Sequence, residues 1–311
     1  MQRRKFIKNT GMLAAGIVLN KYAALAAADA SAAPQLLTVL HTNDVHSRLE
    51  PFPMDGGRNQ GMGGVAARAS LIKEIRAKEK NILLLDAGDI FQGTPYFNLY
   101  KGEPEIKAMA AMGYDGCTMG NHDFDAGMEN FATQLSKGNF PLIIANYNFA
   151  NTPLEGKSVP YKIYNRGNIK IGVLGIGIEM RGLVPDTLYG NTIYQNPIEK
   201  ANEVAYKLKV QERCNLVICL SHLGYKYDNN KISDQVLAKE TNYIDLIIGA
   251  HTHTFMPQPE VIKNKNGSDV LINQVGWGGI QLGRLDFEFS KKNGKNFLKS
   301  HTLPIEKKKA E

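Results

Sequence analysis

Five short segments of the chain concentrate side chains that bind metals or move protons. The densest is 120–125, where an amide, an imidazole and two carboxylates follow a short apolar run. The other four also carry Asp or His residues behind an apolar, strand-like run; they are 44–46, 86–89, 221–222 and 249–253. Such density is unusual for loops with only structural duties. We therefore predict that the five segments meet in space and form a two-metal site.

The spacing of these side chains supports a shared site. Asp44 and His46 are two residues apart, so both side chains point to one side of an extended segment. The same holds for His251 and His253. The ends of adjacent strands in an α/β sheet bring such loops together from distant parts of the chain. A carboxylate such as Asp89 can also bridge two cations through its two oxygens.

The distribution of histidines sharpens this prediction. Of the seven histidines, only His41 and His301 fall outside the five segments. A lone histidine is more often a structural or surface residue than a ligand. Five of them together with Asp44, Asp89 and Asn121 leave little room for that explanation. The five are His46, His122, His222, His251 and His253.

The chemistry of this set points to hydrolysis. Nitrogen and oxygen ligands without a thiolate suit zinc, manganese or iron, and they argue against a closed structural zinc site. Two such cations about 3.5–4 Å apart clamp a phosphoryl group and lower the pKa of a bridging water. They also offset charge on the attacking and leaving oxygens. Phosphate-ester hydrolysis is the reaction that needs this arrangement.

Charge and composition exclude other classes of function. The chain has 311 residues, 43% of them hydrophobic, and a formal net charge of +7. The basic surplus belongs to the two ends, because residues 34–290 contain 25 basic and 27 acidic side chains. A nucleic-acid-binding face is therefore not expected. Residues 291–311 are predicted to form a basic C-terminal tail.

The N-terminal residues 1–33 read as an export signal. An Arg-Arg pair at 3–4 precedes a modest apolar stretch over 11–19 and an Ala-rich region with several cleavage sites. This order resembles a twin-arginine (Tat) signal and predicts a periplasmic protein. A chance Arg-Arg pair before a Sec-type signal is the alternative. The apolar stretch is about half the roughly 20 residues that a membrane span requires, so no membrane span is expected.

The remaining pattern predicts one α/β domain over 34–290. Short, largely apolar or β-branched runs predict strands at 36–41, 81–86, 141–146, 216–220 and 244–248, and 114–119 is read as a further short strand. Helical spacing predicts helices near 65–80, 105–112, 128–135 and 198–208. A hairpin is expected over 161–175, and antiparallel strands from 269 onward. Such alternation favours two sheets packed together and covered by helices. The three cysteines, Cys117, Cys214 and Cys219, are predicted to be buried free thiols.

Six sequence motifs together resemble one known family. They are LHTNDVHSR (40–48), GGVA (63–66), LLDAGD with FQGTP (84–89 and 91–95), GNHDFD (120–125), SHLG (221–224) and GAHTH (249–253). In this order they resemble the calcineurin-like metallophosphatases, and more narrowly the catalytic N-terminal domain of the 5′-nucleotidases. The resemblance implies a four-layer αββα sandwich, with two mixed sheets covered by helices.

The resemblance also implies roles for individual residues. One metal would be held by Asp44, His46, Asp89 and His253, and the second by Asp89, Asn121, His222 and His251. His122, oriented by Asp125, would stabilise the transition state or assist the leaving oxygen, and Asn121 and His122 would contact the substrate. Asp125 has an alternative role as the N-cap of the helix that begins near residue 128. Asp86 and Asp123 are expected to support the site from behind.

The expected activity is hydrolysis of nucleoside 5′-phosphates or similar small phosphate esters. The alternatives are a phosphodiesterase or pyrophosphatase acting on UDP-sugars or cyclic nucleotides, and a metal-binding subunit without turnover. The family's C-terminal domain, which binds the nucleobase, has no counterpart in this sequence, so a separate polypeptide is expected to supply it. Trp277, between Gly276 and Gly278, could replace the base-binding aromatics; the alternative is a core or sheet-edge residue.

Overall fold

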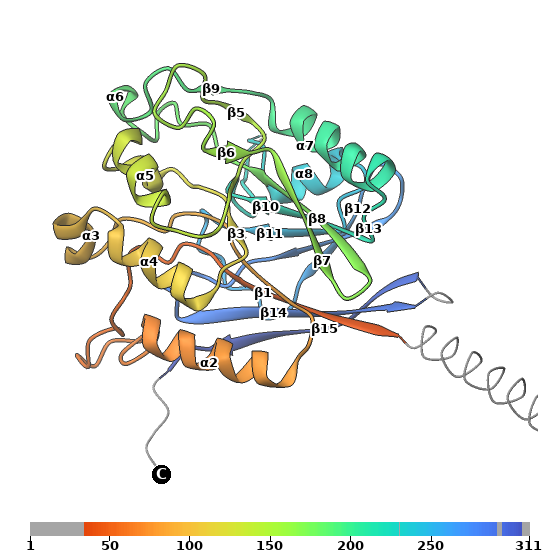
Figure 1. The fold of residues 1–311 in the computed structure, drawn as a ribbon, viewed down its shortest axis with the longest axis horizontal. Coiled ribbons are helices and arrows are strands. Elements are labelled where there is room, and N and C mark those ends of the chain that lie inside the picture. The colour runs from red at the N-terminus through yellow and green to blue at the C-terminus, as the bar shows by residue number, and fades with distance from the viewer. Residues whose placement is uncertain (1–33, 230, 291–293, 307–311) are drawn as a thin grey trace, which may run out of the picture.

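The computed structural model describes residues 34–229, 231–290 and 294–306. In these residues two mixed β-sheets lie face to face, and helices cover the outer face of each sheet (Figure 1). The layers follow the order helix, sheet, sheet, helix. The prediction of a four-layer αββα sandwich is therefore confirmed.

The first sheet contains seven strands in the order β15-β14-β1-β2-β3-β4-β6. The five strands from β1 to β6 run parallel, whereas β14 pairs antiparallel with β1 and β15 pairs antiparallel with β14. The strands are β1 (Gln35–Thr42), β2 (Ile82–Asp86), β3 (Gly116–Cys117), β4 (Leu142–Ile143), β6 (Ser158–Val159), β14 (Gln281–Ser290) and β15 (Gly294–Pro304).

The second sheet contains six strands in the order β12-β13-β11-β10-β8-β7. The four central strands are parallel, and β7 and β12 add antiparallel edges. The strands are β7 (Tyr161–Arg166), β8 (Ile169–Ile176), β10 (Leu216–Ser221), β11 (Leu246–Gly249), β12 (Glu260–Lys263) and β13 (Asp269–Asn273). A separate small sheet pairs β5 (Tyr147–Asn148) with β9 (Ile193–Tyr194).

Two features of the C-terminal part differ from the sequence prediction. The antiparallel prediction from residue 269 is right for β14 and for the pairing of β13 with β12, but it is wrong for the pairing of β13 with β11, which is parallel. A run of β-branched residues favours a strand without specifying its partner, so the direction of pairing is decided by the neighbouring strand. Residues 294–304, which the sequence analysis assigns to a basic tail, form β15.

The helices start and stop at recognisable signals. Before α7 the side chain of Asn196 accepts hydrogen bonds from two backbone N–H groups, and Pro197 occupies the first turn. At the end of α4 the chain turns through Gly113, which has a φ of 70°. The helices are α2 (Val65–Lys78), α3 (Pro95–Tyr100), α4 (Glu103–Met112), η1 (His122–Phe124), α5 (Met128–Leu135), α6 (Asp186–Tyr189), α7 (Pro197–Tyr206), η2 (Lys207–Gln211) and α8 (Asp234–Glu240).

Three buried apolar clusters separate the four layers. Strand β2 shows how one run serves two of them: Leu83 and Leu85 pack between the sheets, whereas Ile82 and Leu84 pack against the cluster that includes α4 and α5. In the same way, alternate residues of β10 face the first sheet or the cluster beneath α7 and α8. Apolar runs without alternation thus match strands that are covered on both faces.

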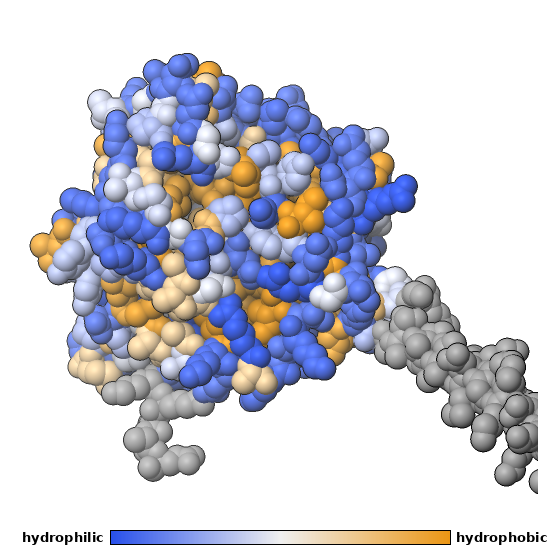
Figure 2. All heavy atoms as spheres, in the orientation of Figure 1, coloured by the Kyte–Doolittle hydropathy of each residue, from blue (hydrophilic) through white to orange (hydrophobic). Residues whose placement is uncertain are grey.

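Other sequence predictions can be checked against the described residues. Cys117, Cys214 and Cys219 are buried and free, as predicted. None of the helices in the described ranges has the length and apolar character to cross a bilayer. The surface in Figure 2 is mostly hydrophilic, with hydrophobic patches between polar side chains. The predicted signal segment 1–33 lies outside the described residues.

Candidate metal centre

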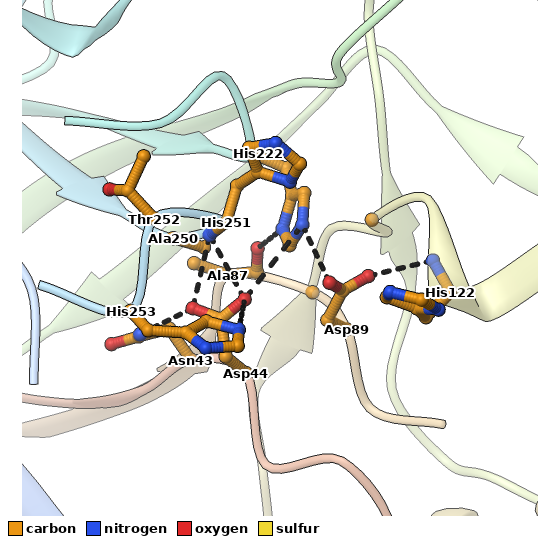
Figure 3. A network of polar contacts seen from close by, with 12 residues as sticks. Asn43, Asp44, Ala87, Asp89, His122, His222, Ala250, His251, Thr252 and His253 are labelled. Atoms are coloured by element: carbon orange, nitrogen blue, oxygen red, sulfur yellow. Dashed lines mark hydrogen bonds and ion pairs between the residues drawn. The ribbon is translucent and has the colours of Figure 1, made fainter. Parts of the chain in front are cut away.

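All seven predicted metal ligands follow the carboxyl ends of parallel strands. In chain order, Asp44 and His46 follow β1, Asp89 follows β2, Asn121 follows β3, His222 follows β10, and His251 and His253 follow β11. The first three strands belong to one sheet and the last two to the other. The ligands therefore meet at one rim of the sandwich, where His222, His251 and His253 face Asp44 and Asp89 (Figure 3).

The backbone at this rim is strained. The φ angles of five of these residues lie between 48° and 70°, in the left-handed region; the five are Asp44, His46, Asp89, His251 and His253. Each such angle costs a non-glycine residue on the order of 1–3 kcal/mol, so the surrounding contacts must offset it. The backbone N–H of Asp44 donates to Gly88 O at 2.9 Å, and that of His46 donates to Asp89 O at 3.0 Å. Backbone hydrogen bonds thus hold the ligand loops in an unfavourable conformation.

Asp44, His46 and His253 form the first ligand group, with one ligand atom from each lying within 4.8 Å of the others. The Nε2 atoms of His46 and His253 are 3.0 Å apart, and His253 Nε2 is 3.6 Å from Asp44 Oδ1. Two nitrogens that bind one cation at about 2.1 Å each lie roughly 3.0 Å apart at right angles and roughly 3.4 Å apart in a tetrahedral site. The two imidazoles therefore converge as ligands of one ion do.

Asp89, His222 and His251 form the second group, again within 4.8 Å of one another. His222 contacts Ala87 O through Nδ1 at 2.8 Å, which leaves the lone pair on Nε2 free to face the centre. Asp89 Oδ2 is 3.1 Å from this Nε2 and 3.8 Å from Nε2 of His46 in the first group. Asp89 thus stands between the two groups, where a bridging carboxylate is expected.

Asn121 follows β3, between Gly120 and His122, which both approach Asp89 of the second group. Its Oδ1 is buried and has no hydrogen-bond partner within the described ranges. Nε2 of His222 is also buried, and Asp89 Oδ2 lies 3.1 Å from it. An unpaired buried acceptor costs about 1–3 kcal/mol, and a divalent cation would satisfy Asn121 Oδ1. The residues present therefore fit a dinuclear metal centre.

The charges of the centre are tightly linked. Burial raises the pKa of Asp44 to about 8. Burial would also raise the pKa of Asp89, but His222 and His46 outweigh it and hold that pKa well below its ordinary value. Burial disfavours a charged His222, yet Asp89 and Asp44 raise its pKa to about 10. Without a cation, a proton on His222 offsets the carboxylates, and a metal binding there would displace it.

The other three histidines are held neutral, as metal ligands require. Burial lowers the pKa of His251 to about 3 and that of His253 to about 4. Burial also lowers the pKa of His46, whose Nδ1 lies 3.3 Å from Phe91 O. At neutral pH each imidazole therefore keeps a lone pair for a cation.

His122 behaves differently from these ligands. Its Nδ1 lies 2.9 Å from Asp125 Oδ2, and this hydrogen bond raises its pKa above the ordinary value. The side chain is 37% exposed, and its backbone N–H donates to Asp89 Oδ1 at 2.9 Å. Gly127, and not Asp125, is the N-cap of α5, so the capping alternative for Asp125 does not apply. His122 is thus a proton-carrying group beside the metal ligands.

Asp123 holds the two loops that carry Asp89 and Asn121. Its carboxylate accepts four backbone N–H groups at 2.8–3.1 Å, from Asp89, Ile90, Phe91 and Gly120. Asp86 acts in a similar way, accepting from the Thr42 hydroxyl and from Gly88 N–H. Both carboxylates support ligand loops from behind, as expected from the sequence.

A second supporting network was not predicted. Ser221 Oγ donates to Asp234 Oδ1 at 2.5 Å, next to the ligand His222. Gln274 Nε2 donates to Ala250 O at 2.7 Å, and its Oε1 accepts the Thr254 N–H at 2.9 Å. The loop with His251 and His253 is thereby fixed from β13. One Gln and one Asp without a spacing pattern give no signal in the sequence.

A cavity of about 350 Å³ opens beside the first ligand group. Its lining consists of His46, Arg48, Gln92, Gly93, His122, His253, Trp277 and Gly278. Trp277 is half-buried and stacks on His253, with 5.9 Å between the ring centroids and an interplanar angle of 16°. Phe52 meets the Trp277 ring edge-on, with 5.5 Å between the centroids. Trp277 thus packs on a predicted ligand and lines the opening.

Comparison with known proteins decides the family. Residues 37–255, more than half of the chain, match the model of the calcineurin-like phosphoesterases. This chain belongs to that family. A snake venom 5′-nucleotidase of Gloydius brevicauda is 35% identical over 290 residues, which covers 86% of the phosphoesterase and 47% of the relative. The resemblance seen in the sequence motifs is confirmed.

Solved structures agree with this assignment. A 5′-nucleotidase precursor of Thermus thermophilus has a TM-score of 0.77 and 32% identity, and the match covers 88% of the phosphoesterase and 55% of that chain. The NAD nucleotidase of Haemophilus influenzae has a TM-score of 0.76 and 28% identity, over 88% and 51% of the two chains. The chain thus spans about half the length of the relatives it matches. Family membership and the two ligand groups together imply divalent metal cofactors.

Proposed function

We propose that the chain is a dinuclear-metal phosphomonoesterase that hydrolyses nucleoside 5′-phosphates or similar small phosphate esters. The observation that carries the proposal is that two ligand groups share Asp89 as their common neighbour, with the His122–Asp125 pair at the same rim. The 5′-nucleotidase relatives support the nucleotide part of the proposal. Zinc, manganese and iron suit the mixed nitrogen and oxygen ligands.

The proposed roles follow from the positions of the side chains. Asp44, His46, Asp89 and His253 would hold one cation, and Asp89, Asn121, His222 and His251 the second. When bound, the two cations would supply a hydroxide at neutral pH and offset the charge of the phosphoryl oxygens. His122 carries a proton that Asp125 favours, and it donates that proton towards the oxygen that leaves. Asn121 and His122 contact the phosphoryl group from the β3 side.

The second candidate activity is cleavage of a pyrophosphate or phosphodiester bond. One specific observation favours it: the structural neighbour from Haemophilus influenzae is named an NAD nucleotidase. The same metal centre can attack either class of bond, since only the leaving group differs. A panel with AMP, UDP-glucose, NAD and a cyclic nucleotide separates the two candidates by their kcat/KM values.

The decisive experiment removes the shared carboxylate. We expect Asp89→Ala to abolish phosphate release from AMP and p-nitrophenyl phosphate, and to lower the bound metal measured by elemental analysis. Asp269→Asn is the matched control, because Asp269 is an exposed carboxylate at the amino end of β13, away from the rim. Retained turnover in Asp89→Ala would refute the assignment. A metal-loaded parent that releases no phosphate from any ester tested would favour the binding-subunit alternative.

We further propose that residues 34–290, together with β15, act as one domain, and that the protein reaches the periplasm through a Tat-type signal at 1–33. The twin arginines support export.

A further inference from the structure

The side chains of the candidate metal centre differ in their exposure. The Asp44, Asp89 and His222 side chains are 0–2% exposed, whereas those of His122 and His253 are 37% and 39% exposed. His122 and His253 also line the cavity of about 350 Å³. Cavities of this size hold small ligands. This cavity is therefore where we expect the leaving group of a bound phosphate ester to lie.

The wall of this cavity carries an arginine that has no acidic partner among the described residues. Arg48 lines the cavity, and among the described residues no carboxylate lies within 4.0 Å of its guanidinium. None of the eight lining residues is acidic. The guanidinium carbon of Arg48 lies over the ring of Phe52, 4.1 Å from its centre. Its Nε is buried without a hydrogen-bond partner in the described part of the chain.

The aromatic residues hold this arginine in place. Phe52 lies beneath the guanidinium and meets Trp277 edge-on at 5.5 Å, and Trp277 stacks on His253. The stack connects Arg48 to the metal ligands through packed rings, so its charge stays on the cavity wall. A guanidinium is always charged and matches the oxygens of a carboxylate or phosphate with paired hydrogen bonds. An anionic group of a bound ligand would give Arg48 the partner that the cavity lining does not supply.

We propose that Arg48 binds a second anionic group, a phosphate or a carboxylate, in the leaving part of the ester. The inference rests on the proposed phosphatase function and adds a substrate class to it: esters whose leaving group is itself an anion are preferred over esters with a neutral leaving group. Trp277 and Phe52 form the apolar side of the same subsite. Arg48 is thus a specificity-determining residue.

The test compares substrate pairs in which one member carries the second anion in its leaving group. The metal-loaded parent, Arg48→Gln and Arg48→Lys are assayed with two pairs: the esters phenyl phosphate and 4-carboxyphenyl phosphate, and the ester AMP with the phosphoanhydride ADP. For each pair we compare the kcat/KM of the substrate with an anionic leaving group to that of the substrate with a neutral one. We expect Arg48→Gln to lower this ratio by about tenfold or more in at least one pair, because losing a hydrogen bond to a charged group weakens binding by about that factor. Arg48→Lys keeps the charge and should recover part of the ratio.

A control variant and a binding measurement accompany the kinetic test. Arg213→Gln removes an exposed arginine that precedes β10 at the opposite end of the sheet, and it should leave both ratios unchanged. Calorimetry with phenylphosphonate and 4-carboxyphenylphosphonate measures the same preference without turnover. Equal losses for both members of each pair in Arg48→Gln would mean that Arg48 only supports Phe52, and would overturn the inference. If the parent releases phosphate from none of the four substrates, the proposed function fails, and calorimetry still decides the role of Arg48.

Discussion

His41 gives a test of the fold that does not depend on activity. It lies on β1 directly opposite Gly283 of β14, where a Cβ atom would fall 2.0 Å from Nε2 of His41. Its Nε2 lies 2.8 Å from Oδ1 of Asn273, the last residue of β13, so this hydrogen bond joins the two sheets. The side chain is fully buried, and burial lowers its pKa from 6.5 to about 4.

This shift predicts a loss of stability in mild acid. Between pH 4 and 6.5 the unfolded chain binds a proton at His41 that the folded protein does not, so stability falls as the pH falls through this window. With these two pKa values, the contribution lost between pH 7.5 and pH 5 is about 2 kcal/mol. The raised pKa values of Asp86 and Asp123 act in the opposite direction, because the folded protein takes up their protons first.

A matched substitution isolates the His41 contribution. His41→Gln keeps a nitrogen donor for Asn273 and cannot titrate, whereas the buried carboxylates are common to both proteins and cancel. For each protein we take the difference between its free energy of unfolding at pH 7.5 and at pH 5. We expect the parent to lose about 2 kcal/mol more than His41→Gln over this interval. Urea unfolding of both metal-free proteins at each pH measures this difference. Identical pH dependences for parent and variant would refute the reasoning.

Three further predictions concern the metal centre. Gly120→Ala would place a Cβ 2.1 Å from Asp89 Oδ1, so we expect bound metal to fall; a full metal content by elemental analysis would contradict the proposed second group. Asp125→Asn removes the negative charge of the partner that raises the pKa of His122, so the alkaline limb of the kcat/KM profile should move to lower pH, and an unmoved limb would assign the proton to another group. Asp123→Asn presents an NH₂ group to backbone donors, which should cost about 2–6 kcal/mol of unfolding free energy in urea; a loss below about 0.5 kcal/mol would exclude the supporting role.

The strand ends at the rim could be predicted because buried parallel strands leave a plain signature. Residues 82–85 and 216–220 are apolar at every position, and a polar residue follows each run. Both runs form strands that are covered on two faces. The metal-binding segments follow these runs directly. Chemistry-bearing residue types at the ends of such runs therefore locate the site before any coordinates are known.

Other parts of the fold left no such signature. Helix α8 has seven residues, too few for a helical period to stand out, and β13 pairs parallel with β11 because of its neighbour and not its own composition. The Asp234–Gln274 contact depends on a fold in which residues 40 positions apart come together. Long-range partners of single polar residues are set by topology, which local sequence does not encode.

Each ligand group draws on both halves of the sandwich: β1 and β11 flank the first, and β2 and β10 flank the second. Apolar contacts fill the space between the sheets, and hydrogen bonds such as His41–Asn273 and His222–Ala87 join the sheets directly. A pair of cations would add metal–ligand bonds between the two sheets at the edge where the chemistry takes place. Metal uptake would then raise the free energy of unfolding as well as supply the reactive centre.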